Sequence, residues 1–289
     1  LSILHFYVKV VQLREERSSA MKTRVISAVV MIAVAVLCMA LGNITRILFF
    51  AICACICAYE LFSNLKSKDV NCALWVFWAY ILGDSLIVIF DLDIIWSVAW
   101  LAVSVFFAMF SGIVNRKIDG KGAFSTVSII LYPLFSFSLI MRIASSEIWV
   151  QSLLLAAAST WICDSFALFG GMLFGKHKVA PDVSPHKTVE GCICGAVSSL
   201  LAGAAVFLVL KNSLYIPLHT CLATAFIVST LGQIGDLAES LVKRMLGVKD
   251  ISNLIPGHGG MFDRADSLLF SIPSSYFCLL FADSIWHFI

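Results

Sequence analysis

The chain has 289 residues, of which 60% are hydrophobic and only 13% carry a charged side chain. A typical soluble domain is about 45–50% apolar and roughly 25% charged. This composition, with a mean hydropathy of +0.96, excludes a soluble globular enzyme and a disordered chain. The net charge of +2 is too small to indicate a nucleic-acid partner. The sequence therefore predicts an all-α polytopic membrane protein.

The stretch 1–20 precedes the first predicted helix. It mixes apolar and polar residues and contains the charged run Arg14–Arg17. We expect it to be an N-terminal extension or a flexible tail ahead of Met21. The apolar run after Arg24 is too long, and lacks a small-residue cleavage site, for a removable signal peptide.

Apolar windows along the rest of the chain predict about nine transmembrane helices, since one span needs about 20 mostly apolar residues. The third window is the weakest, because Gly83 and Asp84 lie in its middle. We expect residues 21–145 to form a group of N-terminal membrane helices and residues 146–289 to form the catalytic region. The predicted spans are 25–41, 46–63, 72–91, 94–114, 122–143, 149–170, 191–210, 217–234 and 267–288.

The basic residues predict which side of the membrane each loop faces. With nine spans, alternate segments beginning at the N-terminus hold all 20 Lys and Arg residues except Arg46, Arg142 and Lys211. Cytoplasmic loops carry the excess of Lys and Arg in membrane proteins. The N-terminus and the two long polar segments, 171–190 and 235–266, are therefore expected in the cytoplasm.

One helical stripe of polar residues begins where the eighth predicted span ends. Asp236, Glu239, Ser240 and Lys243 are spaced i, i+3, i+4 and i+7, so they share a helix face. The alternative interpretation is an amphipathic helix end with i,i+4 ion pairs. Acidic residues at membrane depth are costly and indicate function or a partner, as for Asp164. Three further acidic residues lie inside predicted spans without an assigned role: Glu60, Asp84 and Asp283.

A glycine-rich turn follows, with the sequence Pro256-Gly257-His258-Gly259-Gly260. Glycines permit positive φ, and successive N–H groups in such a turn can bind a phosphate; a flexible hairpin is the alternative. Charged residues flank this turn on both sides. The carboxylates are oxygen ligands suited to a hard cation such as Mg²⁺, and the basic side chains can neutralise phosphates. The carboxylates are Asp236, Asp250, Asp263 and Asp266, and the basic residues are Lys243, Arg244, Lys249 and Arg264.

A second polar segment lies just before the seventh predicted span. Ser184, Lys187 and Thr188 directly precede that helix, and helix N-termini favour anions. These residues are candidates for binding a nucleotide phosphate, although the isolated pattern is weak.

At these residues the sequence resembles the phosphatidate cytidylyltransferases (CDP-diacylglycerol synthases) of the bacterial integral-membrane type. The family signature has the form S-x-aliphatic-K-R-x4-K-D-x-small-x2-aliphatic-P-x-H-G-G-aliphatic-x-D-R-aliphatic-D. Residues 240–266 match every polar position, and Ala265 is smaller than the usual aliphatic residue. Residues 184–191 also resemble the family's S-P-x-K-T-x-E-G segment.

The resemblance implies a reaction in which CTP and phosphatidic acid give CDP-diacylglycerol and pyrophosphate, with Mg²⁺ and a possible second cation as cofactor. It also implies a homodimer in the bacterial cytoplasmic (inner) membrane with the active site in the cytoplasm. Asp236 and Asp263 are then the principal metal ligands, with Asp250 and Asp266 as secondary candidates. The other implied catalytic residues are Lys243, Arg244, Lys249, His258 and Arg264, and the implied substrate-binding residues are Ser184, Lys187, Thr188, Ser240, Gly257, Gly259 and Gly260.

Two alternatives remain open at this point. A cation-coupled transporter would use the intramembrane carboxylates Asp84, Asp164 and Asp236 as an ion path. It would leave the dense cluster of Lys, Arg, Gly and His at one face unexplained, and the chain shows no internal repeat. A cytidylyltransferase acting on another lipid phosphate is the second alternative.

Overall fold

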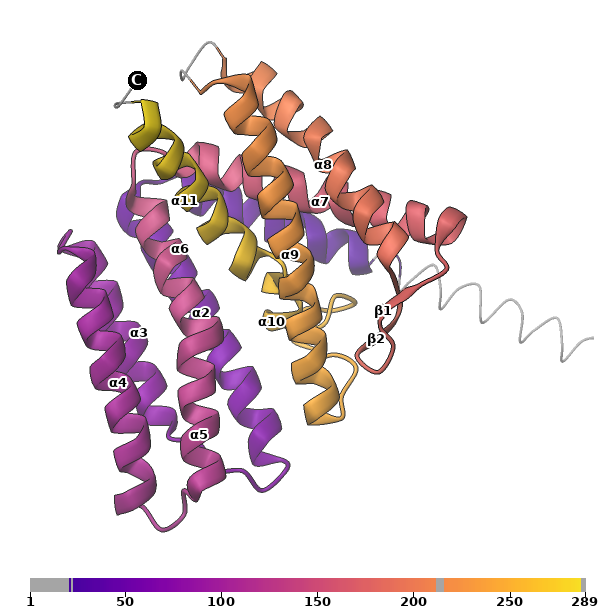
Figure 1. Ribbon diagram of the computed structural model, residues 1–289. Coiled ribbons are helices and arrows are strands. Elements are labelled where there is room, and N and C mark those ends of the chain that lie inside the picture. Colours follow the sequence, from indigo (N-terminus) through magenta and orange to yellow (C-terminus); the bar gives the residue numbers. More distant parts are fainter. Residues whose placement is uncertain (1–20, 22, 212–215, 287–289) are drawn as a thin grey trace, which may run out of the picture.

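The computed structural model describes residues 21, 23–211 and 216–286, so the predicted extension at 1–20 lies outside the described residues. Helices dominate these residues, and the all-α polytopic fold is confirmed (Figure 1). The elements after the N-terminal helix Thr23–Ala40 are α2 (Asn43–Lys66), α3 (Leu74–Ile89), α4 (Ile94–Val114), α5 (Gly120–Ile129), the π-helix η1 (Ile130–Leu134), α6 (Phe135–Ser145), α7 (Trp149–Phe174), β1 (Lys178–Ala180), β2 (Ser184–Thr188), α8 (Val189–Leu210), α9 (Leu218–Leu246), α10 (Phe262–Ala265) and α11 (Leu268–Trp286).

Eight helices within the described residues are long and apolar enough to cross a membrane. The remaining predicted span, 72–91, corresponds to α3, whose 16 residues extend about 24 Å at the usual rise, less than a typical hydrocarbon core of about 30 Å. Large apolar side chains such as Leu82, Phe106 and Leu201 are exposed on the outer faces. In a bilayer these faces contact lipid.

The helices pack as two groups, and their buried hydrophobic residues form one large cluster and one small cluster. The helices α2 to α6 bury one large hydrophobic cluster, to which Val228 of α9 and Leu269 of α11 also belong. In the second group, α7, α8 and α9 approach closely because glycines face their neighbours. A Cβ at Gly195 would lie 2.7 Å from the Cys163 oxygen, and one at Gly203 would lie 2.7 Å from the Cys221 oxygen. Small residues at such crossings are typical of membrane helix packing.

The helix predicted at 122–143 is interrupted by a π-helical turn. Pro133 lies inside η1, between α5 and α6, and a proline cannot donate the backbone hydrogen bond of a regular helix. The wider turn also places Tyr132, whose hydroxyl donates to the Gly235 oxygen at 3.4 Å. π-Helical turns often occur at functional sites.

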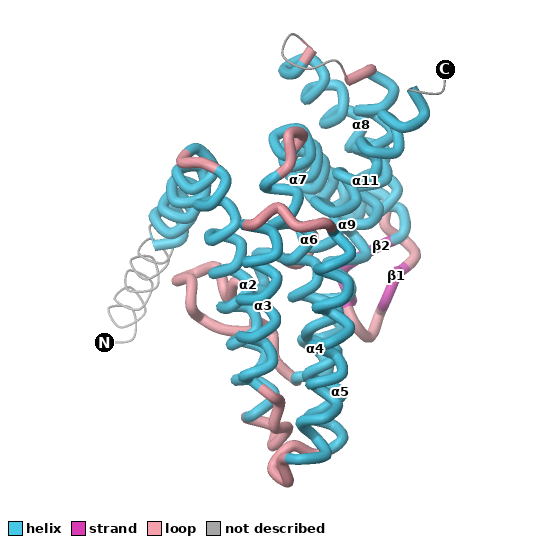
Figure 2. The backbone as a smooth tube through the Cα atoms, turned by 90° about the vertical axis from the view of Figure 1, so that its left-hand side faces the viewer, coloured by secondary structure: helices cyan, strands magenta, loops and turns pink. Residues whose placement is uncertain are grey.

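The segment 171–190, predicted as a loop, contains a short antiparallel hairpin made of β1 and β2. Figure 2 shows these strands outside the helices, beside α9. The end of α9 and the connections α2–α3 and α4–α5 lie at the lower end of the helices in Figure 1, and the hairpin lies higher, beside the lower half of α9. The positively charged segments named above therefore gather at one end of the molecule. The division of the chain at residue 145 stays a prediction.

Candidate active site

The charged end of α9 carries the centre of the site. The helix continues to Leu246 and ends at Gly247, which adopts a left-handed conformation with φ of 65°. Its last turns present Asp236 and Glu239 on one face, as the spacing predicts. Asp266, just after α10, joins them, and one carboxylate oxygen from each residue lies within 4.8 Å of those of the other two. We call Asp236, Glu239 and Asp266 the acidic triad.

The acidic triad has the composition of a hard-cation site. The Glu239 side chain is fully buried, and within the described part of the chain its Oε1 has no hydrogen-bond partner. Its Oε2 lies 2.6 Å from the Lys243 Nζ. Three carboxylates this close repel one another, and an unpartnered buried carboxylate oxygen is costly. An oxygen-preferring divalent cation such as Mg²⁺ fits this donor set.

Asp263 has a different environment from the triad. Its Oδ2 accepts hydrogen bonds from the Ile251 N–H at 2.9 Å and the Gly260 N–H at 2.8 Å, and its Oδ1 lies 3.2 Å from the Lys243 Nζ. Because Lys243 contacts both Glu239 and Asp263, it links Asp263 to the triad. The sequence analysis assigned Asp236 and Asp263 as principal ligands. The structure places Asp236 in the triad and Asp263 directly beside it, where Asp263 pairs with Lys243 and its carboxylate interacts with that of Glu239. The assignment itself stays a prediction.

The glycine-rich turn contacts the N-terminal helix. Gly257 and Gly259 both have positive φ, 78° and 84°, which explains why glycine occupies these positions. The His258 Nδ1 lies 2.9 Å from the Ser27 Oγ, and the same hydroxyl donates to the Pro256 oxygen at 3.0 Å. Ser27 was not among the predicted site residues, because nothing near it in the sequence indicates the contact.

The β1–β2 hairpin is tied to α9 at two points. Lys187 of β2 forms an ion pair with Asp236, and the Arg244 Nε donates to the Val183 oxygen at 3.1 Å. Thr188 is buried at the start of α8 and caps it, accepting a hydrogen bond from the Gly191 N–H at 3.2 Å. Two segments that are far apart in the sequence, both predicted to contribute to the site, therefore meet here.

The remaining predicted residues lie at the margin of the site. Lys249, Asp250 and Arg264 are exposed, and Ser184 and Ser240 are partly buried. Asp250 is not a member of the acidic group that the described residues form. Arg264 interacts electrostatically with Asp266 of the triad.

One member of the triad and two residues near it were not among the predicted site residues. Glu239 was recognised in the helical stripe but was not assigned as a ligand, although its spacing from Asp236 was the available signal. Asp164 of α7 lies close enough to Asp236 and Asp266 to interact with them electrostatically, and it had been noted as an intramembrane carboxylate. Tyr132 is also near the triad, and only the π-helical turn explains its position.

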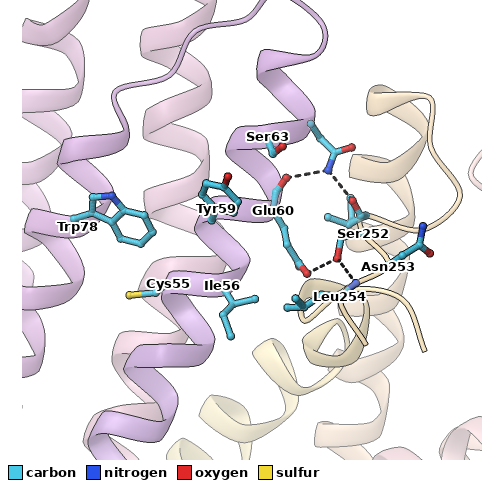
Figure 3. Close-up of a pocket in the computed structure, with 11 residues that line it drawn as sticks. Cys55, Ile56, Tyr59, Glu60, Ser63, Trp78, Ser252, Asn253 and Leu254 are labelled. Carbon is cyan, nitrogen blue, oxygen red and sulfur yellow. Dashed lines mark hydrogen bonds between the residues drawn. The ribbon is translucent and has the colours of Figure 1, made fainter. Parts of the chain in front are cut away.

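A cavity of about 520 Å³ lies beside the glycine-rich turn, between α2, α3 and residues 251–254. Figure 3 shows Glu60 at its wall, with Tyr59 and Trp78 on one side and Ser252 and Leu254 on the other. Glu60, noted above only as a carboxylate inside a span, is therefore next to the predicted signature segment. Asp84 lies elsewhere, in α3, and the side chain of Asp283 is outside the described part.

The helical membrane fold and the cluster of carboxylates and lysines at one end define an integral membrane protein with a site that can bind phosphate groups. A sequence profile described as the cytidylyltransferase family matches residues 22–282. The chain therefore belongs to this family, and the predicted enzyme class, a nucleotidyltransferase, is confirmed. The family match favours an enzyme over the transporter that was the first alternative.

Curated relatives carry one shared name. The chain is 34% identical over 272 residues to the phosphatidate cytidylyltransferase of Thermotoga maritima, covering 89% of this chain and 95% of that protein. It is 45% identical over 124 residues to the phosphatidate cytidylyltransferase of Bacillus subtilis, covering 43% of this chain and 45% of the relative. The same name belongs to a Staphylococcus aureus relative, 40% identical over 121 residues, which are 42% of this chain and 46% of that protein. The predicted resemblance is thus confirmed.

Proposed function

We propose that this membrane enzyme transfers the CMP group of CTP to phosphatidic acid, giving CDP-diacylglycerol and pyrophosphate. The names of the relatives support this substrate. The single observation that carries the proposal is the acidic triad, Asp236, Glu239 and Asp266, gathered within 4.8 Å. Lys187 and Lys243 are paired to two of its members, so the site offers both signs of charge that a nucleotide transfer between anions requires.

In the proposed reaction, a phosphate oxygen of phosphatidic acid attacks the α-phosphorus of CTP. The bond from that phosphorus to the oxygen bridging to the β-phosphate breaks, and pyrophosphate leaves. A phosphomonoester with a second pKa near 6 is already largely dianionic at pH 7, so the reaction needs no strong general base. The protein must instead hold two anions in line and stabilise charge on the leaving group.

We propose Mg²⁺ as the cofactor, with a second cation as a further possibility, held by the acidic triad. The fit rests on the gathering of three carboxylates within 4.8 Å, one of which, the buried Glu239, has an Oε1 without a hydrogen-bond partner among the described residues. When bound, the cation neutralises phosphate charge and helps to align the reacting groups. We propose that Asp263 supports this site by holding Lys243 and the glycine-rich turn, and that Asp250 contributes less because it is exposed.

The basic residues are proposed to bind the phosphates. Lys187 already lies against Asp236, and Lys243 lies between Glu239 and Asp263. Arg244, Lys249 and Arg264 add positive charge around them. Ser184, Ser240, Thr188 and the N–H groups of the glycine-rich turn complete the proposed substrate site, in which His258 shapes the turn.

The proposed reaction also requires an orientation in the membrane. CTP is dissolved in the cytoplasm and phosphatidic acid is embedded in the bilayer, so the site must lie at their boundary. The gathering of basic loops at the triad end supports a cytoplasmic active site. We further propose location in the bacterial cytoplasmic membrane and a homodimeric assembly, as the family resemblance implies.

The test uses the full chain purified in detergent, with labelled CTP, Mg²⁺ and phosphatidic acid. We expect equal amounts of pyrophosphate and a labelled CDP-lipid, with no product in the presence of EDTA. Parallel reactions with other lipid phosphates test the second alternative acceptor. An Asp236→Asn variant purified in the same way is the matched control. Folded protein that produces neither pyrophosphate nor CDP-lipid would refute the proposal.

A further inference from the structure

The carboxylate of Glu60 in α2 is buried and accepts hydrogen bonds from three donors. Its Oε1 accepts from the Ser252 hydroxyl at 2.6 Å and from the Met261 N–H at 2.9 Å, and its Oε2 accepts from the Phe262 N–H at 3.0 Å. Figure 3 shows the carboxylate reaching from α2 to the Ser252 side. Both of its oxygens are therefore engaged, which distinguishes Glu60 from Glu239 of the triad.

A second side chain of α2 reinforces this attachment. Asn64, one turn after Glu60, donates to the Ile251 oxygen at 2.7 Å and to the Glu60 backbone oxygen at 2.9 Å. Helix α2 thus binds the segment 251–262 near both of its ends. This segment includes the glycine-rich turn and has little regular structure of its own, with one bridge between Ile255 and Gly259.

Glu60 and Asp263 bind neighbouring parts of the same backbone. The Asp263 Oδ2 accepts from the Gly260 N–H at 2.8 Å, while Glu60 accepts from the next two N–H groups. A Cβ at Gly260 would lie 2.7 Å from the Glu60 Oε1, and one at Gly259 would lie 2.9 Å from the Asp263 Oδ2. Glycine at 259 and 260 allows the two carboxylates to approach the chain this closely.

The contacts of Glu60 therefore connect it to the proposed site through a chain of neighbouring groups. Glu60 holds the backbone at 261 and 262, and this backbone leads directly into Asp263 and α10. Asp263 in turn contacts Lys243, which contacts Glu239 of the triad. We propose that Glu60 is a positioning residue: by anchoring residues 251–262 to α2, it sets the place of Asp263 and Lys243 beside the triad. This inference rests on the proposed function for its catalytic consequence.

The test compares Glu60→Gln with Asp84→Asn, which makes the same change of carboxylate to amide at another buried site. A glutamine has one acceptor oxygen and an NH₂ group that only donates. In either orientation of the amide, at least one of the Met261 and Phe262 N–H groups faces a donor. Asp84 accepts from Ser138, and among the described residues no hydrogen bond joins it to the segment 251–262, so its variant controls for loss of a buried charge. A Ser252→Ala variant removes the side-chain donor to Glu60 and the acceptor of the Leu254 N–H, and it keeps both backbone contacts of Glu60.

The first readout is hydrogen–deuterium exchange in detergent without substrate or Mg²⁺. We expect faster exchange of peptides from 251–262 in Glu60→Gln and unchanged exchange there in Asp84→Asn. Unchanged exchange of this segment in Glu60→Gln would overturn the inference. Faster exchange throughout the chain would also overturn it, since that result indicates general destabilisation.

The second readout is steady-state kinetics. Residues that orient ligating groups typically contribute about 10–100-fold in activity or metal affinity, so we expect kcat of Glu60→Gln to fall by about that factor. The KM for CTP should change less than about threefold, because the loss concerns geometry in the transition state. Ser252→Ala, which keeps both backbone contacts, should stay within about threefold of the unmodified enzyme. A kcat for Glu60→Gln within twofold of the unmodified enzyme would refute the catalytic role.

The two readouts separate this inference from the proposed function. If the unmodified chain makes no CDP-lipid, the proposed function fails, and the exchange data still decide whether Glu60 anchors residues 251–262. If the unmodified chain is active and Glu60→Gln is equally active, only the present inference fails.

Discussion

Two polar regions of this protein bury carboxylates among membrane helices, and they differ in whether the carboxylate is alone or lies with others. In α3, Asp84 is completely buried; its Oδ2 accepts from the Ser138 hydroxyl at 2.6 Å, and its Oδ1 has no hydrogen-bond partner among the described residues. Ser97 and Arg142 lie nearby, with the Arg142 Nη2 donating to the Ser97 Oγ at 3.2 Å. At the end of α9, by contrast, three carboxylates gather within 4.8 Å.

The difference shows which carboxylates indicate chemistry. An isolated buried carboxylate with a hydroxyl partner and a nearby arginine is consistent with a contact that packs helices together. Three carboxylates in one place repel one another, so they persist together when cations balance them. Lys187 and Lys243 neutralise part of the negative charge of the triad. A divalent cation would neutralise the rest.

The strongest test of this distinction is Asp263→Ala. We expect turnover to become undetectable, because the change removes a carboxylate from the site, leaves the Ile251 and Gly260 N–H groups without their acceptor, and removes one of the two carboxylates paired with Lys243. The measurement is CDP-lipid formation by folded, detergent-solubilised protein. A rate equal to that of the unmodified enzyme would refute the role given to Asp263.

Lys187→Ala should have an intermediate effect. Lys187 pairs with Asp236 at the hairpin, and a hydrogen bond to a charged group contributes about 1.5–3 kcal/mol. We expect the KM for CTP to rise roughly tenfold or more, with a smaller fall in kcat. Initial rates at varied CTP measure this. An unchanged KM would show that the hairpin does not bind the nucleotide.

Metal binding should appear as a change in thermal stability. A ligand that binds only the folded state at about 100 times its Kd stabilises it by roughly 2.7 kcal/mol. We expect Mg²⁺ to raise the Tm by a few degrees relative to EDTA. The increase should disappear in Asp236→Asn and persist in Asp84→Asn. An equal increase in both variants would place the cation outside the triad.

The smallest effect is expected for Asp84→Asn itself. Because Asp84 lies in α3 with Ser138 as its partner, its replacement should leave kcat and KM within about threefold of the unmodified enzyme. The same CDP-lipid assay measures this. A loss comparable to that of Asp263→Ala would remove the distinction between the two regions.

Much of the fold was predictable, because a membrane-spanning helix can be recognised from the apolar composition of about 20 consecutive residues. The apolar windows gave the helices and their approximate ends. The α9 stripe was predictable too, since Asp236 and Glu239 lie one turn apart on one helix. The contacts of Glu60 and Ser27 with the signature segment were not, because they join residues about 200 positions or more apart. The hairpin was missed because its five-residue strand β2, with sequence SPHKT, has no alternating apolar pattern.

The ion pair between Lys187 and Asp236 has a consequence for how substrate enters. Lys187, on the short β1–β2 hairpin at the edge of the helices, is the counter-ion of the Asp236 carboxylate. An incoming triphosphate would compete for that ammonium group and, by drawing it away, free an Asp236 oxygen. If CTP is the substrate, as proposed, its binding and the release of an Asp236 oxygen would be coupled through this single exchange of partners.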